Sequence, residues 1–316
     1  MSGNILLFIL FLALILGVLM LDLLVIGRKS HVVSLREAAT WTSIWILLAL
    51  GCAVFLSFFR EDVHGIGTIE ELDRVLDKFY PYLTQDAESY ASSLEIFRKS
   101  IATNYLSGYL IEKSLSVDNL FVIMAILRAF SVRKVAYKQV LFWGILGAII
   151  MRFIFIFAGV ALIIRFEWLL YFFGAYLLYV GVKMYLDRNK EIRIEPQDHP
   201  VVKFLSKRFN VFPRYVGNRF FFIDDVVVYI TPLFIVIVLI EVSDLIFALD
   251  SIPAIFAVTR DPYIVFFSNI FAILGLRSLF FLLVKVVEKF YLLKIGVSLL
   301  LVFVGMKLIA HEWLVH

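Results

Sequence analysis

The sequence predicts an all-α polytopic membrane protein with about eight transmembrane helices. Hydrophobic residues make up 62% of the chain and charged residues only 18%. The mean hydropathy is +0.94, and long apolar stretches recur along the whole length. A soluble domain of this size would need a far more polar surface, so these observations indicate a chain that crosses a membrane several times.

A helix that crosses the bilayer needs about 20 mainly apolar residues. The stretches that meet this length are 5–26, 38–59, 103–127, 139–164, 166–186, 228–258, 262–284 and 290–310. We do not interpret the first as a cleaved signal peptide, because its leader "MSGN" carries no positive charge and no small-residue cleavage site follows.

The charge of the connecting loops predicts their side of the membrane. Bases gather in the loops after the first, third, fifth and seventh spans, whereas Arg165 and Arg260 stand alone in two of the loops between them. Because cytoplasmic loops carry the excess of Lys and Arg, strict alternation places both termini outside. The net charge of +4 is therefore a sign of topology, and we expect no nucleic-acid partner.

Three stretches outside the spans predict local structure. "TIEELDRVLDKFYPY" (68–82) has helical periodicity and predicts a short exposed helix. "HPVVKFLSKRFNVF" (199–212) is basic and amphipathic, which predicts a segment on the cytoplasmic membrane surface. "RFFFIDDVVVYIT" (219–231) predicts a hairpin around Asp224 and Asp225. None of the three carries a recognisable catalytic motif.

An internal repeat relates the third to fifth spans to the sixth to eighth. At one offset, Glu112 pairs with Asp244 and Asp118 with Asp250. The same offset pairs Asn119 with Ser251 and Arg128 with Arg260. Past a connecting loop that is seven residues shorter in the second copy, Arg152 matches Arg277, and "GVKM" (181–184) resembles "GMKL" (305–308). An odd number of helices per copy forces opposite orientations, which is the inverted repeat of many secondary transporters. Chance similarity between apolar helices is the alternative, but charges matched at equal spacing argue against it.

These features divide the chain into six segments. They are the first two transmembrane helices at 1–60, an external acidic loop at 61–102, repeat 1 at 103–186, a cytoplasmic basic loop at 187–227, repeat 2 at 228–310 and a C-terminal stub at 311–316. In inverted-repeat transporters the site lies at the repeat interface near the middle of the bilayer.

Acidic residues lie inside the predicted spans. They are Glu112, Asp118, Glu241, Asp244 and Asp250. Each acid in the middle of a span costs about 2.5–3.5 kcal/mol on insertion. Ion pairs between helices are the alternative explanation, but Arg152 and Arg277 neutralise at most two acids, and Lys113 a third if it faces inward. The surplus of negative charge favours a cation site, with Arg152 and Arg277 as counter-charges.

The predicted site needs some departure from regular helices. Residues six apart on a helix lie about 120° from each other, so Glu112 and Asp118 would not share a face. Pro253 predicts a kink or an opening beside Asp250. Asp22 either joins the site or forms an ion pair with a base at the membrane edge. Other polar side chains that could complete the site are Asn119, Ser116, Ser243, Ser251 and Asn269.

The available ligands predict a hard divalent cation. No histidine lies in the core of a predicted span, and the lone Cys52 can form neither a disulfide within the chain nor a cysteine cluster. Sites made only of oxygen suit Mg²⁺, Ca²⁺ or Mn²⁺, whereas zinc and copper favour His or Cys. These residues do not choose among the three ions.

Several of these stretches resemble one family. "LIEKSLSVDNLFV" (110–122), the block 239–283 that begins "LIEVSDLIFALDSIP", and "FVGMKLI" (303–309) closely resemble the TerC integral membrane family, particularly its Alx-like branch. The early "LDLLVIGRKSH" (21–31), which contains Asp22, also fits that family. The resemblance implies a role in manganese homeostasis and export, pH-responsive expression and, by older naming, tellurium resistance.

The resemblance also implies that the five intramembrane acids are metal ligands and that the protein lies in the inner (plasma) membrane of a bacterium. The resemblance further implies that relatives have one more C-terminal helix. We therefore expect a secondary transporter that exports Mn²⁺ from the cytoplasm in exchange for protons, with Ca²⁺ and Mg²⁺ not excluded. A membrane partner that delivers metal to exported metalloproteins, without transporting it, is the alternative.

An intramembrane enzyme is a third possibility, but the chain has no G-x-G-D motif and no Walker motif, so we expect no enzyme. The expected partners are the metal ion, protons and the lipid bilayer.

Overall fold

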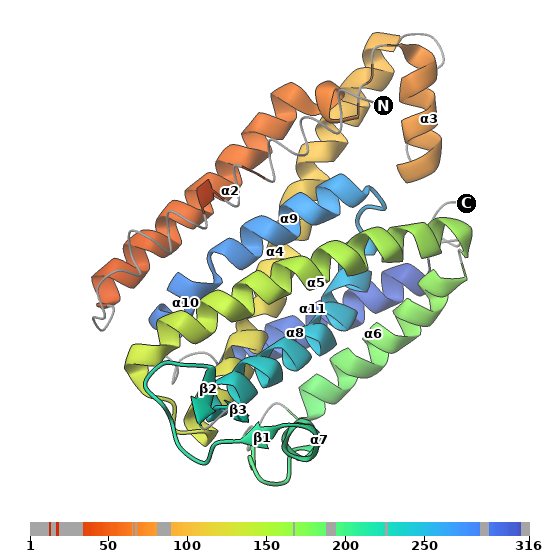
Figure 1. Ribbon diagram of the computed structural model, residues 1–316. Helices are drawn as coiled ribbons and strands as arrows, with labels where there is room; N and C mark the ends of the chain where they lie inside the picture. Colours follow the sequence, from red (N-terminus) through yellow and green to blue (C-terminus); the bar gives the residue numbers. More distant parts are fainter. Residues whose placement is uncertain are drawn as a thin grey trace.

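The computed structural model describes residues 13, 17–18, 34–64, 66, 68–80, 90–166, 168–187, 194–224, 227–284 and 291–310. In these residues the fold is a bundle of helices with one small sheet (Figure 1). Asp22 and all but three residues of the first predicted span lie outside the described part of the chain.

The structure gives the bounds of each element. The helices are α2 (Leu35–His64), α3 (Ile69–Phe79), α4 (Tyr90–Ala129), η2 (Lys134–Ala136), α5 (Tyr137–Arg165), α6 (Leu169–Leu186), α7 (Pro200–Arg208), α8 (Pro232–Phe256), α9 (Pro262–Leu274), α10 (Leu276–Leu283) and α11 (Tyr291–Ile309). The strands are β1 (Asn210–Val211), β2 (Phe221–Asp224) and β3 (Val227–Ile230).

The described helices confirm a polytopic membrane protein. Four of them, α2, α5, α6 and α8, are long and apolar enough to cross a membrane, and α9 with α10 makes a fifth if the bent pair counts as one span. The third predicted span lies in α4, which carries Glu112, Lys113 and Asp118 in its interior and begins well before the predicted start at 103. The apolar part of α11 is shorter, Ile295–Ile309. The total of eight spans stays a prediction.

The break in the helical core lies at a different residue from the one predicted. Of the kink or opening predicted beside Asp250, the opening is wrong, because α8 continues through Asp250 and Pro253 and ends at Phe256. A kink at Pro253 stays a prediction. Pro253 stands so close to the end of α8 that the hydrogen bond it cannot donate is lost where the helix is about to stop. The break lies instead at Gly275, where α9 and α10 meet at 41°.

The two helical segments and the hairpin predicted outside the spans are confirmed, whereas the placement of the basic segment on the membrane surface stays a prediction. α3 begins at Thr68, whose hydroxyl accepts from the Glu71 amide at 3.3 Å while the Thr68 amide donates to the Glu71 carboxylate at 3.2 Å. This reciprocal pair is a capping box. β2 and β3 form the antiparallel hairpin, and α7 covers most of the predicted amphipathic segment. Sequence reasoning missed β1, which pairs in parallel with β3.

Loops predicted on the same side of the membrane lie together. Tyr80 donates to Asp261 at 2.8 Å, which joins two loops predicted to be external. At the other end, Tyr215 donates to the carbonyl of Phe130 at 2.6 Å and Arg133 to that of Gly217 at 2.9 Å. Burial raises the pKa of Tyr215 and keeps it a neutral donor. Figure 1 places α3 and the sheet at opposite ends of the bundle.

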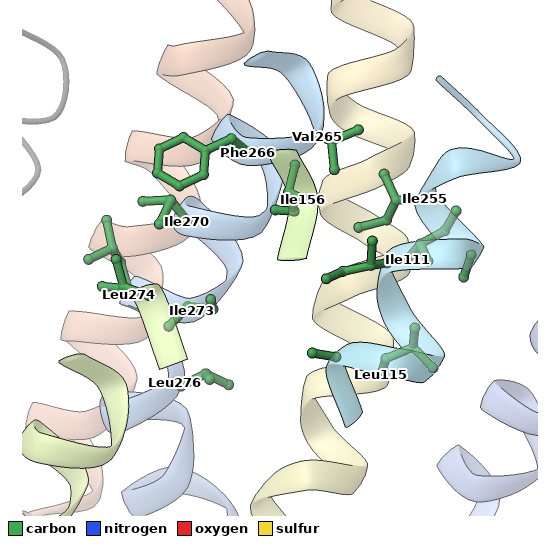
Figure 2. Close-up of a cluster of buried hydrophobic side chains, with 14 of the residues drawn as sticks. Ile111, Leu115, Ile156, Ile255, Val265, Phe266, Ile270, Ile273, Leu274 and Leu276 are labelled. Carbon is green, nitrogen blue, oxygen red and sulfur yellow. The ribbon is translucent and has the colours of Figure 1, made fainter. Parts of the chain in front are cut away.

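Helices α4, α5, α8 and α9 form the centre of the bundle. Figure 2 shows buried side chains of these helices meeting, among them Ile111 of α4, Ile156 of α5, Ile255 of α8 and Phe266 of α9. In a bilayer the surrounding lipid is as apolar as these side chains, so close van der Waals packing holds such helices together. α2 and α10 pack against this centre, and α6 packs along α11.

Small residues allow α6 and α11 to approach closely. A Cβ placed on Gly305 would lie 2.8 Å from the carbonyl oxygen of Gly174, and one on Gly181 would lie 2.9 Å from that of Ser298. Backbones at this distance leave no room for a side chain, which is the small-residue packing common between transmembrane helices.

This packing predicts that adding one methyl group to α11 has different effects at Gly305 and at Gly296. Gly305→Ala should destabilise the protein by about 1–3 kcal/mol, because the methyl group would push α6 and α11 apart. Gly296→Ala is the matched control, since nothing lies within 4 Å of a Cβ built there. Alanine at that position should be neutral or stabilise the helix by up to about 1 kcal/mol. Thermal unfolding of the two variants in detergent compares them, and equal midpoints would contradict the prediction.

Candidate ion site in the helical core

The candidate site is centred on Arg152, which α5 carries into the bundle with 1% of its surface exposed. Its guanidinium forms an ion pair with Glu112 of α4. A second, longer pair joins Arg152 Nη2 to Asp244 Oδ1 of α8 at 3.6 Å. One base thus lies between two buried acids from two helices. With both acids ionised, the three side chains carry one net negative charge.

Two neutral side chains also receive hydrogen bonds from this guanidinium. Arg152 Nη1 donates to Asn269 Oδ1 of α9 at 2.6 Å and to Ser251 Oγ of α8 at 3.3 Å. Asn269 donates its amide to the carbonyl of Val265 at 3.0 Å, which orients its oxygen toward Arg152. The guanidinium therefore joins α4, α5, α8 and α9 at one point.

Two residues of α4 complete this group. Ser116 donates to Glu112 Oε1 at 3.1 Å, and Asn119 Nδ2 donates to Asp244 Oδ1 at 2.7 Å. Among the described residues, Glu112 Oε2, Asp244 Oδ2 and Asn119 Oδ1 are buried and accept no hydrogen bond. Leaving a polar atom buried without a partner costs about 1–3 kcal/mol. We call the group formed by Glu112, Asn119, Arg152 and Asp244 the Arg152 cluster.

A second pair of acids lies on other faces of the same two helices. Asp250 of α8 accepts a hydrogen bond from Tyr176 of α6 at 2.7 Å. Asp118 of α4 is the acid whose charge acts on Asp250. Both aspartates are half-buried. Because α4 and α8 are continuous, acids six residues apart diverge around each helix. Glu112 and Asp244 therefore share Arg152, while Asp118 acts on Asp250.

Glu241 occupies a third position. Its carboxylate lies so close to α5 at Gly147 that any side chain at that glycine would overlap it. The negative charge of Asp244, which lies three residues further along the same face of α8, acts on Glu241. Glu241 is half-buried, unlike Asp244.

The remaining predicted residues lie around these groups. The Ser243 hydroxyl bonds to the Leu239 carbonyl of its own helix at 2.8 Å. Arg277 is buried in α10 just past the bend. Lys113 donates to the carbonyl of Ala272 at 3.2 Å, near the end of α9 and beside that bend. In the described part of the chain, no three His, Cys, Asp or Glu side chains gather closely enough to hold a metal ion. The role of each acid as a ligand stays a prediction.

Sequence reasoning missed Tyr176, Gly147 and the contact that Lys113 makes with the end of α9. Tyrosine and glycine are ordinary residues of transmembrane helices, so neither Tyr176 nor Gly147 stands out from its neighbours in the sequence. Only the packing of α6 and α5 against α8 brings these two residues to the acids.

Comparison with known protein families shows the family of this chain. A profile described as the Integral membrane protein TerC family matches residues 97–316, which include all five acids. The chain belongs to the TerC family. The resemblance seen in the sequence is thereby confirmed.

Curated relatives match most of this TerC-family chain. It is 44% identical over 298 residues to "Uncharacterized membrane protein STKORF319" of Myxococcus xanthus. This alignment covers 94% of this chain and 81% of the relative. It is 41% identical over 292 residues to "Putative membrane-bound redox modulator Alx" of Escherichia coli (strain K12), with 92% and 81% covered. The protein of the same name from Photorhabdus laumondii is 40% identical over 300 residues, with 95% and 84% covered. No solved structure matches.

Proposed function

We propose that this TerC-family protein is a secondary transporter that exports a hard divalent cation, Mn²⁺ in our expectation, from the cytoplasm in exchange for protons. One observation carries the proposal. Three buried oxygens of the Arg152 cluster, Glu112 Oε2, Asp244 Oδ2 and Asn119 Oδ1, accept no hydrogen bond from the described residues. Carboxylate and amide oxygens are the ligands that Mn²⁺, Mg²⁺ and Ca²⁺ prefer.

Charge gives Arg152 a specific role in this proposal. The guanidinium contacts Glu112 Oε1 and Asp244 Oδ1. A divalent ion on the other oxygen of each carboxylate would lie beside it, and the two cations would repel each other. Binding of the ion would therefore require Arg152 to withdraw from at least one of the two acids. When the ion leaves, Arg152 returns and neutralises half of the charge of the two acids, which lowers the cost of reorienting the empty site within the bilayer.

The arrangement of the helices supports an inverted repeat. If "GVKM" in α6 is matched with "GMKL" in α11, Gly181 corresponds to Gly305 and Gly174 to Ser298. Gly181 packs against Ser298, and Gly305 packs against Gly174. Exchanging the two copies therefore maps this contact onto itself, as a two-fold axis in the membrane plane would produce. The pairs α4–α9 and α5–α8 exchange in the same way, and both pack in the core.

We assign the proton step to Asp118 and Asp250. Expelling a divalent ion from a cytoplasm that is negative by about 100 mV costs about 4.6 kcal/mol. Two protons moving inward for each ion would cancel this electrical cost. Each of the two carboxylates can carry one proton, so the pair matches two protons per ion. Asp118 and Asp250 are half-buried, whereas Glu112 and Asp244 are buried in the Arg152 cluster.

Flux measurements in liposomes that contain only this protein test the proposal. An imposed pH gradient should drive Mn²⁺ against its own gradient, and Mn²⁺ flux should move about two protons per ion in the opposite direction. Asp118→Asn and Asp250→Asn should each abolish this coupling. Tyr176→Phe, which removes only the hydrogen bond to Asp250, should weaken the coupling without abolishing it.

Two results would contradict this account. Mn²⁺ flux that ignores the pH gradient would make proton exchange wrong. Mn²⁺ binding without any flux would favour the alternative, a membrane partner that delivers metal to exported metalloproteins.

The name of the Alx relatives mentions redox modulation. The single cysteine of this chain, Cys52, is buried in α2, so the polar residues described above support metal chemistry more directly.

A further inference from the structure

The β2–β3 hairpin exposes apolar side chains on one face. Ile223 lies directly opposite Val228, and Phe221 stands two residues before Ile223, so all three project from the same face. Their exposed fractions are 69%, 55% and 53% in that order. A hairpin surrounded by water would place polar side chains there, and an exposed apolar face indicates contact with lipid or another protein.

This face is continuous with a membrane-spanning helix. The ring of Phe221 packs against that of Phe234, with centroids 4.9 Å apart. Phe234 belongs to the first turn of α8, which is long and apolar enough to cross a bilayer. Thr231, between β3 and α8, donates to the carbonyl of Arg219 at 2.7 Å and holds the hairpin against the start of that helix. The hairpin therefore lies at the level where α8 enters the membrane.

Helix α7 combines a packed face with an unusual outer face. Val201, Val202 and Leu205 pack into the protein. Lys203, Phe204, Lys207 and Arg208 are exposed, with Phe204 at 67%. An aromatic side chain surrounded by bases is typical of a helix that lies in the plane of the membrane interface.

The charge of this region indicates an anionic partner. Residues 200–223 contain five bases and no acid. All of these bases are exposed: Lys203, Lys207, Arg208, Arg214 and Arg219. Lys203 also forms an ion pair at 2.9 Å with Asp198, which is itself exposed. β1 directly follows α7 and pairs with β3 of the hairpin, and Figure 1 shows α7 and the sheet at the same end of the bundle. The bases and the apolar face thus belong to one layer.

We propose that residues 200–223, together with Val227–Ile230, form a lipid-binding layer that recognises anionic phospholipids at the surface of the protein's own membrane. Phe204, Phe221, Ile223 and Val228 enter the boundary between headgroups and acyl chains, and the five bases contact the phosphates. A second copy of the chain fits this layer less well, because a two-fold contact would place five bases against the same five bases. The continuity with α8 also places the layer beside lipid.

The apolar half of the proposal is tested with a tryptophan reporter in nanodiscs of phosphatidylcholine and phosphatidylglycerol. The chain contains five tryptophans, so the signal of Ile223→Trp is taken as the difference from the parent protein. Lipids brominated near the headgroup should quench this added emission, and aqueous acrylamide should not. Quenching by acrylamide alone would overturn insertion, as would a crosslink between two copies at this position in Ile223→Cys.

The charged half is tested by native mass spectrometry of lipids retained after transfer from the same nanodiscs into detergent. One base near an anionic leaflet strengthens binding about fivefold. The combined variant Lys203→Gln, Lys207→Gln and Arg208→Gln should therefore retain at least about tenfold less phosphatidylglycerol. Its control replaces three exposed bases near the opposite end, Arg74→Gln, Lys78→Gln and Lys99→Gln. Unchanged retention in the first variant, or an equal loss in the control, would overturn the proposal.

Discussion

Replacing Arg152 with methionine should destabilise the protein by about 3–5 kcal/mol, the largest stability effect that we expect from one substitution in the described core. The physical reason is the pair of buried acids, Glu112 and Asp244, that this one base serves. Without it, two carboxylates remain inside the bundle with no counter-charge. Chemical unfolding of the purified protein in detergent, with and without Mn²⁺, measures the effect.

Two comparisons separate an ion pair from a cation site. Arg152→Met combined with Glu112→Gln should recover much of the lost stability, because one buried charge then disappears together with its partner. Mn²⁺ should stabilise Arg152→Met more than it stabilises the parent, since the ion replaces the missing guanidinium. A variant as stable as the parent would show that these pairs contribute nothing, and equal effects of Mn²⁺ on both proteins would place the ion elsewhere.

Asp244→Asn should weaken Mn²⁺ binding by at least about 100-fold, which corresponds to about 2.7 kcal/mol, and should stop transport. The change removes one of the two acids of the Arg152 cluster and leaves Arg152 paired with Glu112, so stability should change little. Isothermal titration with Mn²⁺ measures the loss. Ser243→Ala is the matched control on the neighbouring residue, because that hydroxyl bonds only within α8 in the described structure. Binding within about threefold of the parent would remove Asp244 from the site.

The sequence was sufficient for the features that depend on neighbours along the chain. Hydropathy over some 20 residues identified the spans that α2, α5, α6, α8 and the bent pair α9–α10 support. Loop charge grouped together the loops that the Tyr80–Asp261 and Tyr215–Phe130 contacts join, and the side of the membrane on which they lie stays a prediction. The spacing from Thr68 to Glu71 carries the capping box of α3. The five acids were also found from the sequence, because the free-energy cost of a charge in lipid makes acidic residues rare inside transmembrane spans.

Only the tertiary structure decided which of these groups meet. Glu112 and Asp118 stand on one helix, yet its regular rotation sends the first to Arg152 and the second toward Asp250. Lys113 and Gly275 meet at the helix bend, where sequence reasoning pointed to Pro253. A local pattern specifies the face on which a side chain lies. The partner depends on how α4, α5, α8 and α9 rotate and cross, and many side-chain contacts far apart in the sequence determine that packing together.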